Sequence, residues 1–288
     1  MASVYLRDKK ACTITDVNAD RLWENLIGLP IPEIKWFDSI GSTNDVALQW
    51  AEKGAPDGAL VVADHQSAGR GRMQRRWITP AGSALAFSLI LRPRDDEMIH
   101  LTHFSGLGAL SVSKALDELG LKSEVKWPND VLIARKKTAG VLVELVWQAD
   151  QLQALVIGIG LNVAPASIPP LPEVVFPATC VETMLGKEIN RWELLESILR
   201  HIFLLRPRLG ETSFMKEWEE RLAFYREWVQ VEQPDQTILV GQVIGIDEEG
   251  GLRLLTENQD FIVVTAGDVR LRPIVGQNRW SETGGNPC

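Results

Sequence analysis

A short loop that alternates glycine with arginine is the part of the sequence best suited to bind a charged ligand. The segment DHQSAGRGRMQRRW, residues 64–77, alternates glycine and arginine at 69–72 and adds Arg75 before Trp77. Glycine lets a backbone approach a ligand closely, and guanidinium groups supply fixed positive charge and paired donors that suit carboxylate and phosphate. The segment therefore predicts an anion-binding loop. A solvated basic turn is an alternative that the loop alone leaves open.

A second polar cluster, KWPND at 126–130, follows a short apolar run. Pro128 keeps the residue before it extended and removes a donor from a sheet, so Asn129 and Asp130 are expected at a strand end or turn, where they can serve a ligand. A hairpin would bring Lys137 back beside them. The alternative is an ordinary β-turn followed by a surface lysine.

A third pattern places glycine at alternate positions of an apolar run, at Gly158 and Gly160. Alternate residues of a strand share one face, and glycines weaken a sheet unless something packs closely on the bared backbone. A planar ligand over that face, or close packing by a helix, would each explain the pair. The run is not a dinucleotide-binding fingerprint, because Asn162 leads into a proline-rich stretch and not into a helix.

Apolar runs bounded by turn residues predict the elements that position these clusters. Strands are expected at 34–37, 59–63, 84–91, 123–126, 131–134, 140–147 and 152–163, and those at 59–63 and 84–91 are expected to be buried. Helices are expected from the N-cap Ser42 to Gly54, and at 97–119, 192–205 and 213–227. Ala149-Asp150 is placed to turn the last two strands into a hairpin. An α+β fold with a mixed or mostly antiparallel sheet is therefore expected.

The pattern changes toward the C-terminus, where the apolar runs become shorter. Strands are expected at 237–246, 252–256, 261–265 and 269–271, which predicts a small antiparallel barrel. The predicted division is an N-terminal extension at 1–30, a main domain at 31–230, the barrel at 231–274 and a disordered tail at 275–288.

Composition argues against several classes of function. The formal net charge of −8 argues against a general affinity for nucleic acid or anionic lipid. The three cysteines, Cys12, Cys180 and Cys288, lack the paired spacing of a zinc site or a disulfide framework. The N-terminus shows no signal-peptide pattern, and no apolar run reaches membrane-spanning length. A protein of the reducing cytoplasm is therefore expected.

Taken together, six strings resemble those of biotin protein ligases in order and approximate spacing. They are Ser42-Thr43-Asn44, Gln66, the loop at 69–72, KWPND at 126–130, Lys137 with Gly140, and Gly158-Ile159-Gly160-Leu161-Asn162. The resemblance spans about residues 34–165 and extends more loosely to the end. It implies a mixed sheet with flanking helices, related to class II aminoacyl-tRNA synthetases, and a C-terminal SH3-like β-barrel. Only about thirty residues precede the strand at Ile34, so the DNA-binding domain of regulatory members is not expected.

The resemblance implies a ligase that activates biotin with ATP and Mg²⁺ and transfers it from biotinyl-AMP to a lysine of a biotin carboxyl carrier domain. For biotin it implies Ser42, Thr43, Asn44, Gln66, Arg70, Gly71, Arg72, Lys137, Gly140, Leu142, Gly158 and Gly160. For ATP it implies Arg70, Arg72, Arg75, Trp77, Lys126, Asn129, Lys137 and Asn162. Lys137, Arg72 and Asp130 are expected to act in catalysis, and no protein-bound metal is expected. A monomer or homodimer without nucleic-acid or membrane partners is expected.

Charge explains why these residue types suit such a reaction. A carboxylate and the α-phosphate of ATP are both anions, so arginines, Lys137 and Mg²⁺ must supply compensating positive charge. The mixed anhydride hydrolyses readily, so a loop that orders over it would protect it. The attacking lysine must be neutral, which makes Asp130 a candidate for orienting it or relaying its proton.

One departure from the family pattern and two alternatives remain open. Met73-Gln74 stands where many members carry a glycine, so a stiffer loop is expected. A lipoate ligase or octanoyl transferase of the same fold is one alternative, against which the loop at 69–72 and the KWPND string favour biotin. A nucleic-acid-binding module that uses the arginine loop is the other, and one basic loop on an acidic chain gives it little support.

Overall fold

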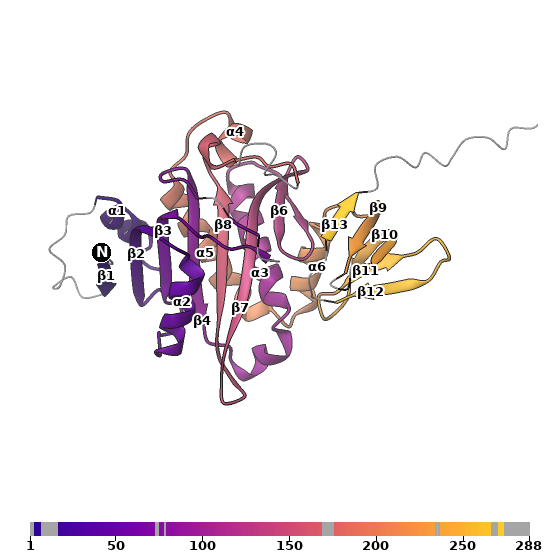
Figure 1. Cartoon of the computed structure of the whole chain (residues 1–288), viewed down its shortest axis with the longest axis horizontal. Helices are drawn as coiled ribbons and strands as arrows, with labels where there is room; N and C mark the ends of the chain where they lie inside the picture. The colour runs from indigo at the N-terminus through magenta and orange to yellow at the C-terminus, as the bar shows by residue number, and fades with distance from the viewer. Residues whose placement is uncertain are drawn as a thin grey trace, which may run out of the picture.

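The computed structural model of the chain describes residues 3–6, 17–72, 75–77, 79–168, 176–233, 235, 237–265 and 270–273. A large mixed sheet and a smaller antiparallel sheet organise these residues (Figure 1). The glycine-arginine loop follows one strand of the large sheet, and the other two clusters lie within that sheet. The architecture therefore brings the three sequence clusters onto one scaffold.

Eight strands form the large sheet, in the order β1-β2-β3-β4-β8-β7-β6-β5. They are β1 (Ser3–Leu6), β2 (Glu33–Ile40), β3 (Leu60–Gln66), β4 (Ala84–Leu91), β5 (Glu124–Lys126), β6 (Asp130–Ile133), β7 (Lys136–Gln148) and β8 (Gln151–Asn162). β2 and β3 run parallel, and the other neighbouring pairs are antiparallel. The predicted mixed sheet is confirmed, as is the hairpin at Ala149-Asp150, where both residues have positive φ.

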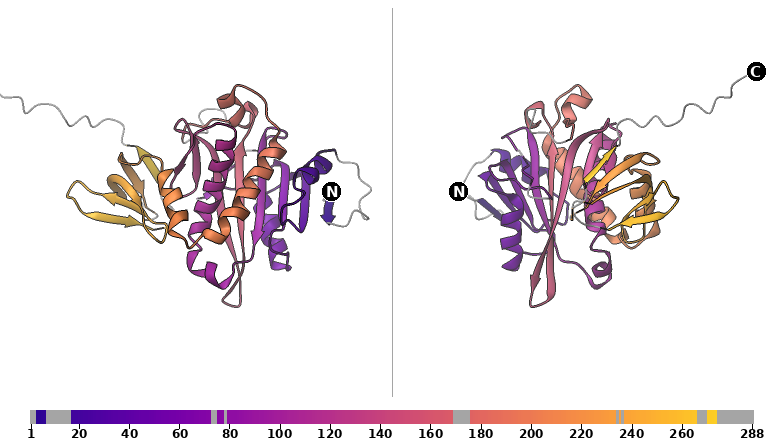
Figure 2. Two further views of the ribbon diagram at one scale, coloured as in Figure 1. Left: turned by 180° about the vertical axis from the view of Figure 1, so that it is seen from behind. Right: turned by 45° about the vertical axis from the view of Figure 1, so that its right-hand side comes forward.

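Helices cover both faces of the large sheet. α3 (His103–Glu118) and α5 (Arg191–Leu205) pack together on one face, shown in the left panel of Figure 2. α2 (Thr43–Glu52) packs on β3, β4 and β8. The other helices are α1 (Val17–Asn25), α4 (Val181–Leu185), α6 (Thr212–Glu220), η2 (Asp95–His100), η3 (Pro165–Ser167) and η4 (Arg206–Arg208). None of the helices in the described ranges is long and apolar enough to cross a bilayer.

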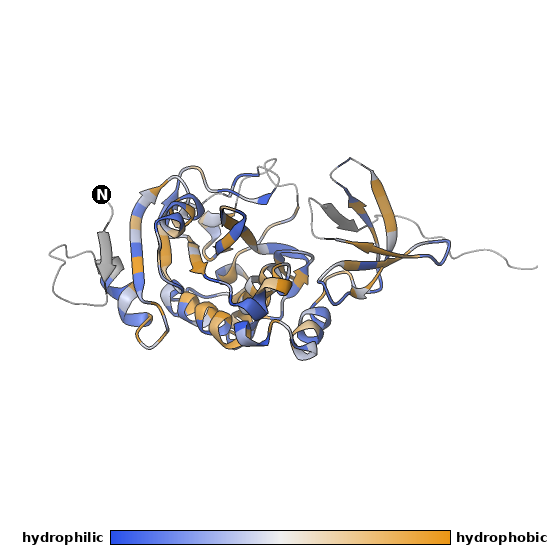
Figure 3. Cartoon of the chain, turned by 90° about the horizontal axis from the view of Figure 1, so that it is seen from below, coloured by the Kyte–Doolittle hydropathy of each residue, from blue (hydrophilic) through white to orange (hydrophobic). Residues whose placement is uncertain are grey.

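Two apolar clusters hold these layers together. The larger one includes Phe87 of β4 and Phe104 of α3, and Figure 3 shows hydrophobic residues along the helices that pack on the sheet. The smaller one joins Ala47 and Ala51 of α2 to Val156 of β8. Alanine has a short side chain, so α2 can approach the sheet closely. Every residue of β4 is buried, as expected for a strand covered on both faces.

The segment before residue 31 contributes to the same structure. β1 pairs antiparallel with β2 and forms one edge of the large sheet. α1 packs against α5 and places Leu22 in the larger apolar cluster, and Leu26, directly after the helix, lies in the same cluster. The described residues of the predicted extension therefore complete one side of the main domain.

The C-terminal sheet contains β9 (Trp228–Glu232), β10 (Ile238–Ile246), β11 (Leu252–Leu255), β12 (Phe261–Val264) and β13 (Arg270–Pro273). The strands are antiparallel, in the order β12-β11-β10-β9-β13, and Figure 3 shows them beside the main domain. β9 crosses the domain boundary predicted at 230/231, because Val229 and Val231 are buried in this sheet. The small antiparallel C-terminal domain is confirmed, and the predicted tail at 275–288 lies outside the described residues.

Two helix predictions were wrong in their extent. The predicted helix at 97–119 is divided into η2 and α3, because the buried carboxylate of Glu97 accepts hydrogen bonds from Arg94 N and from Arg206 and so closes a separate turn. The predicted helix at 213–227 ends with α6 at Glu220. The chain then pairs with β5, where Val125 N donates to the carbonyl oxygen of Arg221. Ser42 is the N-cap of α2 as predicted, but its side chain makes no capping hydrogen bond.

Candidate functional site

The floor of the candidate site is a patch of small residues where β4, β8 and β7 run side by side. Two rows cross these strands, Ala86–Gly160–Gly140 and Ser88–Gly158–Leu142. Alternate residues share a face, and Val156, two positions before Gly158, packs beneath α2. The glycine-bared backbone therefore faces the α2 side of the sheet.

A network of polar side chains closes one end of this floor. The side-chain oxygen of Gln66, at the end of β3, accepts hydrogen bonds from Thr43 N at 2.8 Å and Thr43 Oγ1 at 3.1 Å. The Ser88 hydroxyl lies within hydrogen-bond distance of both Thr43 Oγ1 and Asn44 Oδ1. All four side chains are buried, and a Cβ on Gly158 would overlap the Asn44 amide. Asn44 therefore packs directly on β8, and only glycine leaves room for it at position 158.

Glu144 connects this polar end to the glycine-arginine loop. Asn44 Nδ2 donates to Glu144 Oε2 at 2.8 Å. The Arg70 guanidinium donates to both oxygens of the same carboxylate, at 3.0 and 2.8 Å, and lies 2.7 Å from Asp45 Oδ1. Arg70 is thus bracketed by two carboxylates. Its charge is already balanced in this structure, and it attaches the loop to α2 and β7.

Backbone hydrogen bonds shape the described part of the loop. Trp77 N donates to Gly69 O at 2.8 Å, and Gly71 N donates to Arg75 O at 2.7 Å. A Cβ on Gly69 would lie 2.5 Å from Trp77 O, so this position requires glycine. Arg75 N donates to Arg72 O at 3.2 Å, which closes a turn, and Met73 and Gln74 lie outside the described residues. The described part of the loop is therefore narrow, and Gly69 permits the close approach of its two sides.

The indole of Trp77 occupies the space above Gly160. A Cβ on Gly160 would overlap this ring, and one on Gly140 would lie 3.5 Å from it. The sequence left open a planar ligand or a helix over Gly158 and Gly160. In the structure, Asn44 of helix α2 packs on Gly158, whereas the planar side chain of Trp77 covers Gly160. Trp77 Nε1 is buried and finds no hydrogen-bond partner among the described residues.

Two lysines and one aspartate form the other end of the site. Asp130 Oδ1 lies 2.6 Å from Lys137 Nζ, and Asp130 Oδ2 lies 3.0 Å from Lys126 Nζ. Lys137 also lies over the Trp77 ring, 5.6 Å from its centroid. Burial would raise the pKa of the Asp130 carboxyl, but the two ammonium groups outweigh burial and hold that pKa well below its usual range. Asp130 is therefore a fixed anion between two cations.

Neighbouring segments hold these charged groups in place. Asn129 Nδ2 donates to Val141 O at 2.7 Å, and Val141 N returns a bond to Asn129 O at 2.9 Å. Asn162 donates to Thr179 O, and Thr179 N in turn donates to Lys137 O. Asn129 and Asn162 thus use their side chains to position the backbone around Lys137.

The structure joins the predicted residues into two groups. Thr43, Asn44 and Gln66 form the polar end. Lys126, Asp130, Lys137 and Trp77 form the charged end. Ser42 is buried beside Thr43, Leu142 is half-buried beside Gly158, and Arg75 is exposed. Ser88 and Glu144 were not among the predicted site residues. Each is a polar residue within an apolar run, 84–91 or 140–147, which is a usable signal.

No group of three or more His, Cys, Asp or Glu side chains suited to a metal ion occurs in the described part of the chain. Asp130, the buried carboxylate of the site, is already shared by two lysines. Mg²⁺ commonly binds through one or two carboxylates together with substrate phosphates. Asp130 therefore offers a magnesium ion one carboxylate whose oxygens are both paired with lysines, so substrate phosphates would have to supply most of the ligands of such an ion.

Comparison with known proteins identifies close similarities. Residues 36–162 match the model of the biotin/lipoate A/B protein ligase family, and 227–272 match the biotin protein ligase C-terminal domain. The chain is 34% identical over 249 residues to the bifunctional ligase/repressor BirA of Bacillus subtilis, covering 82% of this chain and 73% of that protein. It is 32% identical over 237 residues to the biotin–[acetyl-CoA-carboxylase] ligase of Mycobacterium tuberculosis, covering 80% and 85%. The structure of the Aquifex aeolicus biotin protein ligase in complex with biotin and ATP has a TM-score of 0.73 and 32% identity, covering 84% and 99%.

Proposed function

The chain belongs to the biotin/lipoate A/B protein ligase family, as a biotin protein ligase, and from this premise we propose how its residues carry out the reaction. The enzyme joins biotin to ATP, releases pyrophosphate, and transfers biotin from biotinyl-AMP to a lysine of a carrier protein. The lipoate alternative is not favoured, because the C-terminal domain matches the biotin protein ligase model and the similar structure was solved with biotin.

The polar end suits the urea ring of biotin. A urea offers one carbonyl oxygen and two N–H groups, so its site needs donors and acceptors together. Thr43, Gln66 and Asn44 supply both kinds within one buried network. Because these side chains are already held by each other and by Ser88, the recognition site is formed before the ligand arrives, which limits the ordering cost of binding.

The glycine floor leads from the polar end toward Lys137. The register pairs Leu142 with Gly158 and Gly140 with Gly160, and a Cβ on Gly140 would lie 3.2 Å from Lys137 Nζ. A chain laid along this floor would place its carboxylate beside the lysine. Trp77 covers the same stretch, so we propose that its indole forms the wall against which the biotin tail and the adenylate lie, after moving off Gly160.

The charged end supplies the electrostatic stabilisation that adenylation needs. The attack of a carboxylate oxygen on the α-phosphorus forms one C–O–P bridge and breaks the bond to pyrophosphate. The attacking carboxylate and the phosphates are all negatively charged during this step. Lys126 and Lys137 carry two positive charges against the single charge of Asp130, so one net positive charge remains for the ligand. Fixed charges of this kind act most strongly where water is excluded. We assign Lys137 to the reacting carboxylate and phosphate, and Lys126 to the phosphates.

The low pKa of Asp130 changes the role that the sequence suggested for it. A carboxylate whose pKa is held far below neutrality is a weak base, and both of its oxygens are occupied by ammonium groups. We therefore propose that Asp130 positions the two lysines and does not take the proton of the acceptor lysine. In the second step, the acceptor amine attacks the acyl carbon, AMP leaves, and the proton passes to solvent.

We propose a biotin carboxyl carrier domain as the acceptor, as the name of the Mycobacterium tuberculosis relative suggests. We also propose that the enzyme works in the cytoplasm, as a monomer or homodimer, and that the main domain and the C-terminal domain meet near residue 227, where the second family match begins.

One experiment tests the proposed function directly. The full chain is incubated with biotin, MgATP and an isolated carrier domain, and the carrier is analysed by intact mass. A gain of one biotin less one water, which requires both ATP and the carrier lysine, is expected. Lipoate offered in place of biotin should leave the carrier mass unchanged. An unmodified carrier in the presence of biotin and MgATP would refute the proposal.

A further inference from the structure

The turn between β10 and β11, residues 247–251, joins the C-terminal sheet to the charged end of the site. We propose that this turn is a positioning element for adenylation, acting through Trp127 on Lys126 and Asp130. The inference rests on the proposed function, because it assumes that the two lysines serve the nucleotide.

Three successive carbonyl groups of this turn face three side chains of the main domain. Trp127 Nε1 donates to Gly250 O at 2.7 Å, and Thr102 Oγ1 donates to Glu249 O at 2.6 Å. The His103 ring lies between two carbonyl oxygens, with Nε2 2.9 Å from Glu248 O and Nδ1 2.8 Å from Leu209 O. A contact that uses consecutive carbonyls fixes both the position and the direction of the turn. The C-terminal sheet is thus attached by a specific hydrogen-bonded seam.

Trp127 carries this attachment into the site. It is the residue between Lys126 and the Pro128-Asn129 turn, and its side chain is 1% exposed. Lys126 and Asp130 are register partners on β5 and β6, so the three residues between them set how their side chains meet. A shift of the indole would therefore move the backbone from which Lys126 projects.

The same short turn is held from two other directions. Ser105 Oγ on α3 donates to Pro128 O at 3.0 Å, and Asn129 exchanges backbone and side-chain bonds with Val141 on β7. The hydrogen bond from Trp127 to Gly250 O attaches the same turn to the C-terminal sheet. Since an indole has a single N–H donor, loss of its bond releases that side of the turn while the α3 and β7 contacts remain. We therefore expect a displaced charged end and not an unfolded protein.

The polar end of the site is held by a separate set of bonds. Gln66 bonds to Thr43 and Thr79, Ser88 bonds to Thr43 and Asn44, and Asn44 bonds to β7. Among the described residues none of these side-chain bonds reaches 126–130 or 247–251. A perturbation of Trp127 should therefore separate nucleotide binding from biotin binding. A general loss of structure would reduce both.

The test compares two tryptophan-to-phenylalanine variants of the full chain. Trp127→Phe removes the donor to Gly250, whereas Trp218→Phe makes the same change at an equally buried indole whose Nε1 has no hydrogen-bond partner within the described residues. Trp218 also packs on this turn, 3.1 Å from the place of a Cβ on Gly250, so the control shares the local environment. KM and kcat are measured against MgATP in carrier biotinylation, and biotin affinity is measured by calorimetry without nucleotide.

We expect Trp127→Phe to raise KM for MgATP about tenfold, the usual size of one lost hydrogen bond expressed as an equilibrium constant, with unchanged biotin affinity. Trp218→Phe should change neither value. Thr102→Val, which releases the neighbouring carbonyl, should raise KM in the same direction but less, and it decides the question if Trp127→Phe does not fold. An unchanged KM in Trp127→Phe, an equal rise in Trp218→Phe, or a fall in kcat alone would overturn the inference. An inactive wild type would instead refute the proposed function.

Discussion

Replacing Asp130 with asparagine separates a positioning role from a proton-transfer role, because the amide keeps the shape of the carboxylate and loses its charge. The carboxylate oxygens lie 2.6 Å from Lys137 Nζ and 3.0 Å from Lys126 Nζ. At an effective dielectric constant near 20 these attractions amount to about 6 and about 5.5 kcal/mol, and desolvation of three ions offsets most of this. Removing one member of a buried pair costs about 3–5 kcal/mol. Lys137 is 25% exposed and can be rehydrated, so we expect the lower value, about 3 kcal/mol.

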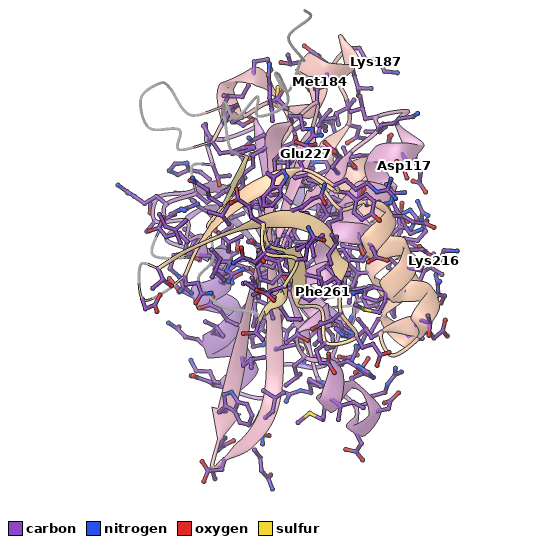
Figure 4. All side chains as sticks on the ribbon, turned by 90° about the vertical axis from the view of Figure 1, so that its right-hand side faces the viewer. Asp117, Met184, Lys187, Lys216, Glu227 and Phe261 are labelled. Carbon is purple, nitrogen blue, oxygen red and sulfur yellow. The ribbon has the colours of Figure 1, made fainter. Side chains whose placement is uncertain are left out.

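The assay is urea denaturation across pH, together with pyrophosphate release. The pKa of Asp130 is depressed in the folded state, so its contribution to stability is complete above its usual value of 3.8 and is lost as pH falls through the folded pKa. The difference between wild type and Asp130→Asn should therefore be constant at neutral pH and shrink under acid. Asp117→Asn is the matched control. Asp117 pairs with Arg221 at the surface near α6, on the flank labelled in Figure 4, and its loss should cost under about 1 kcal/mol.

The same variant tests the catalytic assignment. If Asp130 holds the lysines, pyrophosphate release should fall by far more than the transfer of biotin from supplied biotinyl-AMP to the carrier. If Asp130 accepts the proton of the acceptor lysine, the transfer step should fall most and its pH profile should shift. Normal pyrophosphate release by a stable Asp130→Asn protein would refute the positioning role.

Three further predictions concern other charged groups. Lys137→Ala should lower adenylate formation about 100-fold or more while far-ultraviolet circular dichroism stays native, because the lysine is partly exposed and Asp130 keeps Lys126; normal pyrophosphate release would contradict this. Arg72→Gly should release free biotinyl-AMP faster, since the turn closed by Arg72 O loses side-chain restriction; equal leakage in a radiolabelled biotin chase would contradict it. Glu118 receives a hydrogen bond from Arg200 and others from Ser197 and His201, which lower its pKa to about 2. Glu118→Gln should therefore be less stable than wild type above pH 4.5 and lose that difference as pH falls toward 2, which thermal melts at stepped pH would show.

The sequence predicted the parts of the site that depend on local pattern. The run at 84–91 and the hairpin at Ala149-Asp150 follow from apolar bounds and turn chemistry, and both form as expected. The N-cap at Ser42 places Thr43 and Asn44 at the start of a helix, where they face the sheet. Features that depend on residues close together in the chain could therefore be predicted from the sequence.

Contacts between segments that are distant in the chain could not be predicted from the sequence. The alternate glycines showed that something packs on β8, but only the fold shows that Asn44 and Trp77, each more than 80 positions away, are the groups that do so. The helix predicted at 97–119 failed for the same reason. Its division depends on Arg206, which lies beyond residue 200 and reaches Glu97 only in the folded chain. Periodicity carries no information about such partners.

Arg70 differs from the lysines of the site in its charge balance. Arg70 was expected to contact both biotin and ATP, yet its guanidinium is held by Glu144 and Asp45, and Glu144 is held in turn by Asn44. An arginine balanced by two carboxylates offers little net charge to a phosphate, whereas Lys126 and Lys137 exceed Asp130 by one charge. Of these three cations, the two lysines therefore offer an anionic ligand more net positive charge than Arg70 does. Arg70 and Asn44 both bond to Glu144, so Arg70 links the position of the loop to the polar end of the site.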